Sequence, residues 1–222
     1  MSRFALPLLI FDCDGVLIDS ETIACRAEAA CLAECGILVS ADEIIDRYLG
    51  ISMATMLADL STRLRHSVPA LPPDFAEILR ARVAAAFEAA LQPMPGIARL
   101  LETLPHPRCV ASSSAPERLR QSLSLTGLLC LFQPHIFSAT QVPRGKPAPD
   151  LFLFAAQRMG MAPAGCVVIE DSVPGVQAAT AAGMRVIGFT GGSHCRAGHA
   201  ERLRAAGASV TCNELRDLPD LL

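Results

Sequence analysis

Carboxylates, hydroxyls and one lysine follow four short apolar runs of the sequence, at the points where strands of a sheet would end. The set consists of Asp12, Asp14, Ser112, Ser113, Lys146, Glu170 and Asp171. In an open parallel sheet, ligands bind beyond the carboxyl ends of the strands, so we expect these side chains to meet at one edge. Carboxylates, hydroxyls and an ammonium group together suit a phosphate ester and a hard cation.

Each of these groups also has an ordinary structural explanation when it is taken alone. An Asp-x-Asp-Gly sequence is common at turns, serines cap helices, and acidic residues often precede a helix. Lys146 adds evidence of its own, because it is the only lysine among 19 basic residues. A compact ammonium where arginine is otherwise used indicates a point charge held against a phosphate or a carboxylate. Coincidence explains the whole set poorly.

The combination predicts phosphoryl transfer with Asp12 as the nucleophile. A carboxylate can attack phosphorus and form an aspartyl-phosphate. Mg²⁺ prefers oxygen ligands, which Asp12 and Asp171 can supply. Ser112 and Lys146 would stabilise the charge on the equatorial oxygens of the phosphoryl group. Asp14 would protonate the leaving alkoxide and then activate the water that hydrolyses the intermediate.

The pattern of strands and helices around these residues predicts an α/β fold. Short apolar runs alternate with helical patterns, which is typical of buried parallel strands in a Rossmann-like sheet. The expected strands are 8–11, 109–111, 136–137, 167–169 and 186–189. Helices are expected after Ser114, at Pro149 and at Pro174, with Gly127 and Gly160 closing two of them. The sheet forms the core domain.

A helical segment interrupts this alternation between the first two strands. A helix over 20–35 ends at Gly36, Ser40 and Glu43 form a capping box, and further helices begin after Ser52 and at Asp74. Pro93 to Gly96 marks the return to the core. We therefore predict an α/β core domain of residues 1–18 and 92–222, with a helical cap domain of residues 19–91 inserted into it.

Composition narrows the class of ligand. The chain has 222 residues and a hydrophobic fraction of 51%. Its net charge of -3 and the lack of a dense run of basic residues argue against binding to nucleic acid or to a membrane surface. No apolar run reaches the roughly 20 residues of a spanning helix. We expect a cytoplasmic protein with small metabolites as partners, and the sequence leaves the oligomeric state open.

The nine cysteines indicate reduced, mostly buried thiols rather than disulfides, because the count is odd and the chain is long. One cluster combines histidine and cysteine, at His194, Cys195 and His199. Its spacing is not that of a metal site, so no zinc site is predicted there.

Taken together, these motifs resemble those of the haloacid dehalogenase-like hydrolases, in the branch with a helical cap between the first and second motifs. Residues 12–16, Asp-Cys-Asp-Gly-Val, resemble motif one; Ser112, Lys146 and the pair at 170–171 resemble motifs two to four. The resemblance implies that Asp12 is nucleophile and magnesium ligand. It also implies that Asp14 is the acid/base and gives its backbone carbonyl to the metal. Asp171 would be a ligand with Glu170 beside it.

The resemblance also implies a cap that closes over the substrate. Substrate contacts are expected from Ser113 of the core and, in the cap, from Tyr48, Gly50, Ile51, Ser52 and Met53. The name-giving dehalogenases lack the second aspartate, and relatives that cleave phosphonates use a cap lysine, which residues 19–91 do not contain. Relatives of the β-phosphoglucomutase type carry a cap histidine and arginine where this chain has Ala24 and Met53.

These differences favour a phosphatase, acting on a sugar or sugar-acid phosphate such as 6-phosphogluconate. A phosphosugar mutase is the alternative. From other classes, a receiver-like signalling domain would not need the cap or the second acidic pair, and a non-catalytic phosphate-binding protein would not need the full catalytic set.

Overall fold

The computed structural model describes residues 6–49, 53–64 and 69–222. The chain divides into two compact units, one formed by residues up to Asp19 together with Gln92–Leu222, the other by Ser20–Leu91. Each unit has its own buried cluster of apolar side chains.

The first unit is built on a six-stranded parallel sheet. Its strands are β1 (Leu8–Phe11), β2 (Arg108–Ser112), β3 (Ile136–Ser138), β4 (Cys166–Glu170), β5 (Arg185–Phe189) and β6 (Val210–Cys212). They lie in the order β3-β2-β1-β4-β5-β6, and every neighbouring pair is parallel. The predicted α/β class and Rossmann-like sheet are confirmed. The strand β6 was not predicted, because only one of its three residues is buried and no apolar run marks it.

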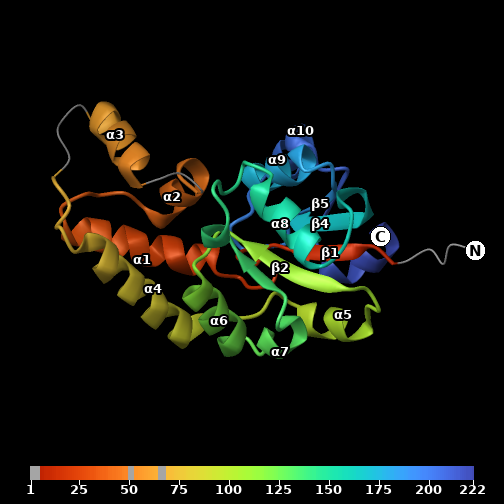
Figure 1. Cartoon of the computed structure of the whole chain (residues 1–222). Helices are drawn as coiled ribbons and strands as arrows, with labels where there is room; N and C mark the ends of the chain where they lie inside the picture. Colours follow the sequence, from red (N-terminus) through yellow and green to blue (C-terminus); the bar gives the residue numbers. More distant parts are fainter. Residues whose placement is uncertain (1–5, 50–52, 65–68) are drawn as a thin grey trace, which may run out of the picture. The chain divides into compact units, whose positions relative to one another are not determined.

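Helices cover both faces of this sheet (Figure 1). One face packs against α8 (Asp150–Arg158), α9 (Val173–Ala181) and α10 (His199–Ala206). The other carries α5 (Ile97–Thr103), α6 (Pro116–Leu125), α7 (Leu129–Phe132) and the short helix η3 (Leu215–Leu221); further short turns are η1 (Ala139–Gln141) and η2 (Pro163–Gly165). Burial on both faces explains why the strands read as continuous apolar runs rather than alternating ones.

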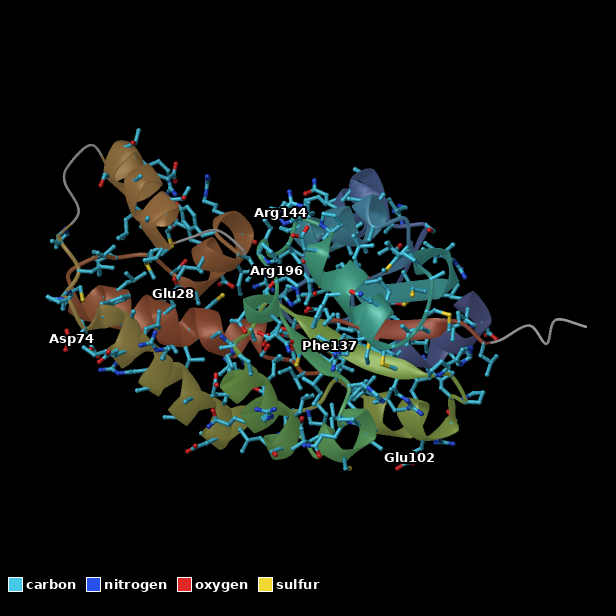
Figure 2. The ribbon with its side chains drawn as sticks, viewed as in Figure 1. Glu28, Asp74, Glu102, Phe137, Arg144 and Arg196 are labelled. Atoms are coloured by element: carbon cyan, nitrogen blue, oxygen red, sulfur yellow. The ribbon has the colours of Figure 1, made fainter. Side chains whose placement is uncertain are left out.

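Side chains of successive strand residues point to opposite faces. Leu8 and Ile10 belong to the cluster beneath α8 and α9, and Phe137 of β3 joins the same cluster (Figure 2). Phe11 instead meets Phe132 of α7 edge to face, with ring centroids 5.9 Å apart. All four residues of β1 are buried, so the strand that leads to Asp12 lies at the centre of the core.

The second unit is helical. It contains α1 (Glu21–Glu34), α2 (Ala41–Arg47), α3 (Met53–Leu64) and α4 (Phe75–Ala90), and α1 packs against α4. Ser40 caps α2, since its Oγ accepts a hydrogen bond of 3.1 Å from the backbone N–H of Glu43. This is one half of the predicted capping box; the Glu43 carboxylate instead pairs with Arg63. The core of this unit includes Leu32, Ile44 and Phe75.

The nine cysteines are free thiols and six of them are buried, as the sequence predicts. Within the ranges that the structure describes, no helix combines the length and the apolar character needed to cross a bilayer.

The α8 helix offers a test of the core assignment with an internal control. Leu151 is fully buried, whereas Leu153 on the same helix is 39% exposed. Leu151→Ala is expected to lower the free energy of unfolding by about 2–5 kcal/mol, because it leaves a cavity. Leu153→Ala should cost less than about 1 kcal/mol. Urea unfolding of the two variants measures both values, and equal losses would contradict the packing of α8.

Candidate active site

The topology of the sheet creates a crevice at β1 and β4. From β1 the chain proceeds to β2 and β3 on one side of the sheet, and β4 then resumes on the other side of β1. Ligands of open α/β sheets bind at such a switch point, beyond the carboxyl ends of the strands. Asp12 follows β1 and its backbone N–H donates to the Ile169 carbonyl at 3.0 Å. Asp12 is thereby fixed beside the end of β4.

Lys146 is held against two of the predicted carboxylates. Its Nζ lies 2.6 Å from Asp12 Oδ1 and 3.0 Å from Glu170 Oε2, and its side chain is 5% exposed. The ammonium also lies 5.0 Å from the ring centroid of Phe152. Burial disfavours the charged ammonium, but the carboxylates of Asp12 and Glu170 outweigh it and raise the pKa of Lys146. The lysine is a fixed positive charge at the end of β1.

Glu170 uses both carboxylate oxygens in contacts with its neighbours. Oε2 faces Lys146, while Oε1 accepts from the Ser172 hydroxyl and, at 3.3 Å, from the Ser172 N–H. Ser172 Oγ in turn accepts from the N–H of Gly175 at 3.1 Å and caps α9. Burial, more than any neighbouring charge, raises the pKa of Glu170. This residue ties the lysine to the start of α9.

Asp171 is held by two histidines from the loop after β5 and the start of α10. His194 Nε2 lies 3.0 Å from Asp171 Oδ2, and His199 Nε2 lies 2.6 Å from the Asp171 backbone carbonyl. Burial opposes a charge on His194, yet the Asp171 carboxylate and Cys195 raise the pKa of this imidazole to about 11. His194 is therefore a partner of the acidic cluster.

His194, Cys195 and His199 are close in sequence, and the structure brings their side chains together as well. Their potential ligand atoms lie within 4.8 Å of one another. The histidine nitrogens described above are already engaged with Asp171, and His199 Nδ1 lies 3.0 Å from Arg202 Nη2. His194 follows Asp171 by 23 residues in the sequence, and only the fold brings the two together. No local sequence motif could therefore have predicted this contact.

The acidic cluster fits a magnesium ion. The carboxylate oxygens of Asp12, Glu170 and Asp171 approach within 4.8 Å of one another, and all three residues are buried. Burial and then the nearby Glu170 raise the pKa of Asp12, so a positive charge here would relieve an unfavourable concentration of carboxylates. The contacts described use both oxygens of Glu170 but one each of Asp12 and Asp171. Hard cations favour such oxygen donors.

Asp14 is bound by Ser114, which the sequence places at the start of a helix, and by Arg118, which no sequence feature marks. Ser114 Oγ donates to Asp14 Oδ2 at 2.7 Å, and Arg118 Nη2 donates to Asp14 Oδ1 at 3.1 Å. Ser112 is buried, and its Oγ accepts from the N–H of Ser114 at 3.1 Å. The serine run at the end of β2 is the available signal for Ser114, whereas Arg118 is one of many arginines in the chain.

The remaining predicted substrate residues are Ser113 of the first unit and, in the helical unit, Tyr48 and residues 50–53. Ser113 is exposed in the loop after β2, and Met53 begins α3. Tyr48 is buried in the helical unit, where its hydroxyl donates to Asp59 and accepts from Arg63. Gly50, Ile51 and Ser52 lie outside the described residues. Their contacts with substrate stay predictions.

The fold and the site define an α/β enzyme with a carboxylate and lysine centre at the switch point of its sheet. The sequence model of the haloacid dehalogenase-like hydrolases matches residues 6–183. The chain belongs to this family, which confirms the resemblance drawn from its motifs.

Three similar proteins extend the comparison. The chain is 32% identical to the 6-phosphogluconate phosphatase of Escherichia coli K12 over 194 residues, which is 87% of this chain and 86% of that protein. It is 32% identical to hexitol phosphatase B of the same strain, over 80% of this chain and 81% of the relative. A crystal structure of a haloacid dehalogenase-like protein of unknown function from Agrobacterium tumefaciens matches with a TM-score of 0.89 and 39% identity, covering 98% and 97% of the two chains.

Gly175 tests the link between Glu170 and α9. A Cβ at this position would overlap the Glu170 carboxylate. Helix propensity alone would make Gly175→Ala stabilising by about 1 kcal/mol. Because the added methyl must displace Glu170, we expect destabilisation of about 1–3 kcal/mol instead. Thermal and urea unfolding give the sign. A stabilised variant would show that Glu170 is not clamped as described.

Proposed function

We propose that this protein is a magnesium-dependent phosphatase that hydrolyses a small phosphorylated metabolite through a phosphorylated Asp12. The observation that carries the proposal is the buried Lys146, which joins Asp12 to the acidic pair at the end of β4. The family membership and the phosphatases among the relatives support the same activity.

In the first step an Asp12 carboxylate oxygen bonds to phosphorus as the bond from phosphorus to the leaving oxygen breaks. Asp14 donates a proton to that oxygen, so the product leaves as a neutral alcohol. Lys146 donates to the transferring phosphoryl group as its charge redistributes. Ser112 Oγ accepts a hydrogen bond from Ser114, and its own hydroxyl proton is directed to a phosphoryl oxygen.

In the second step water attacks the phosphorus of phospho-Asp12. Asp14, now deprotonated, accepts a proton from that water, and the bond from phosphorus to Asp12 breaks. Inorganic phosphate leaves and the Asp12 carboxylate is restored. Lys146 and Ser112 hold the phosphoryl oxygens in both steps.

Asp12 and Asp171 would hold the magnesium ion through carboxylate oxygens, with the Asp14 backbone carbonyl as a third protein ligand. When bound, the ion neutralises phosphate charge that would otherwise repel the attacking carboxylate. Glu170 contributes by fixing Lys146 and by adding negative charge to the cluster, because both of its oxygens bind Lys146 or Ser172.

The helical segment of residues 19–91 serves as the cap in this proposal. Residues 48–53 supply its contacts with substrate, and Ser113 contributes from the core. Substrates are sugar or sugar-acid phosphates, as the names of the two relatives suggest. A cytoplasmic location stays a prediction.

Asp12→Asn provides the decisive test of the nucleophile. The amide has the same shape but cannot attack phosphorus, so release of phosphate from p-nitrophenyl phosphate with magnesium should be abolished. Circular dichroism should show an unchanged fold. Residual activity above about a tenth of the wild-type value would contradict the assignment. An inactive wild type, against this ester and a panel of sugar phosphates, would instead favour a non-catalytic or receiver-like protein.

A second measurement separates the phosphatase from a mutase. A mutase must protect phospho-Asp12 from water, whereas Ala24 and Met53 offer neither the histidine nor the arginine that we expect to delay hydrolysis. Given β-glucose 1-phosphate and a trace of glucose 1,6-bisphosphate, the enzyme should not isomerise the sugar. Phosphate and glucose 6-phosphate are followed together. Isomerisation faster than phosphate release would identify a mutase.

A further inference from the structure

Both carboxylate oxygens of Asp14 are held by residues of one neighbouring segment. Ser114 Oγ binds Oδ2 at 2.7 Å, and Arg118 Nη2 binds Oδ1 at 3.1 Å. Ser114 lies in the loop after β2, and Arg118 lies in the first turn of α6. These residues are about a hundred positions from Asp14 in sequence, so the contact depends on the sheet that joins β1 to β2.

The segment that holds Asp14 is itself fixed to two strands. The N–H of Ser114 donates to Ser112 Oγ at 3.1 Å, at the end of β2. The Ser114 carbonyl accepts from the hydroxyl of Ser138, at the end of β3, at 2.7 Å. Ser112 and Ser138 are both buried. Because both the N–H and the carbonyl of Ser114 are hydrogen-bonded, the backbone of Ser114 is fixed and so is the position from which its hydroxyl extends.

An exposed ion pair would contribute little, with typical values of about 0–1 kcal/mol. The contact with Asp14 differs on one side, because the Asp14 side chain is only 14% exposed, although that of Arg118 is 39% exposed. Ser114 holds one oxygen of Asp14 and Arg118 holds the other, so the two contacts together fix the plane and direction of the carboxyl group.

We infer that Arg118 is a positioning residue that, with Ser114, aims the Asp14 carboxyl group at the leaving oxygen of the substrate. The inference rests on the proposed function, in which Asp14 is the general acid. Misplacement of a general acid costs most when the leaving group is basic and needs a proton. Loss of Arg118 should therefore make the rate more sensitive to the leaving group, which a loss of substrate binding alone would not do.

The experiment compares p-nitrophenyl phosphate with phenyl phosphate, which has a similar shape but a more basic leaving group. The quantity measured is kcat/KM, because it reports the steps up to departure of the leaving group and omits the later hydrolysis of phospho-Asp12. Arg118→Ala should lower kcat/KM for phenyl phosphate about tenfold or more, and for p-nitrophenyl phosphate less than about threefold. Arg118→Lys should recover part of the loss.

Arg120→Ala is the matched control, since Arg120 is an exposed arginine of the same helix; it should leave both values unchanged. Circular dichroism and thermal unfolding verify that the variants fold, and Arg118→Lys carries the comparison if Arg118→Ala does not. In the Asp14→Asn background, Arg118→Ala should add no further leaving-group dependence, because the group it positions is gone.

An equal loss for the two esters would overturn the inference and assign Arg118 to substrate binding. An Arg118→Ala variant with wild-type kcat/KM for both esters would also overturn it, as would an undiminished effect in the Asp14→Asn background. A wild-type enzyme that cleaves neither ester would instead count against the proposed phosphatase. The two failures are therefore distinguishable.

Discussion

The contact of Lys146 with Asp12 and Glu170 is the interaction on which the site depends. Three carboxylates buried at the end of two adjacent strands repel one another, and burial raises the pKa of Asp12 and of Glu170. One ammonium, 2.6 Å from Asp12 and 3.0 Å from Glu170, offsets part of that repulsion. Removing one partner of such a buried arrangement leaves charge without compensation, which is far more costly than losing a surface pair. The negative charge that remains makes the cluster a fitting site for a divalent cation.

The residues that follow the strands could be predicted from sequence because a parallel sheet brings all its carboxyl ends to one edge. The positions of Asp12, Ser112, Lys146 and Asp171 after successive strands therefore predict that they lie at one edge of the sheet. Five of the six strands could be recognised because burial on both faces produces continuous apolar runs. The strand β6 could not, since its residues are partly exposed.

The supporting residues could not be predicted in the same way. Arg118 contacts Asp14 because α6 begins directly after β2, the strand beside β1. His194 contacts Asp171 because the loop after β5 lies beside the end of β4. Arg118 is one of many arginines, and nothing in its neighbours distinguishes it. His194 stands near Cys195 and His199, but the spacing gives no sign that the group lies beneath a carboxylate. Close approach also depends on Gly15, where a side chain would overlap Asp171 and His194. The sequence marks the functional groups more clearly than the groups that orient them.

The two aspartates of the first motif have different surroundings despite being two residues apart. Asp12 is paired with the buried ammonium of Lys146, so its carboxylate is held beside a fixed positive charge. Asp14 is bound by a hydroxyl and a partly exposed guanidinium, and the hydroxyl can adapt when the carboxyl group gains or loses a proton. Enzymes assign separate roles to neighbouring carboxyl groups by giving them different environments. A carboxylate paired with a buried cation suits attack on phosphorus, and one that has a hydroxyl on one of its oxygens suits proton transfer. The division of labour in the proposed mechanism thus follows from which strand end supports each side chain: Lys146 and β4 support Asp12, while the segment between β2 and α6 supports Asp14.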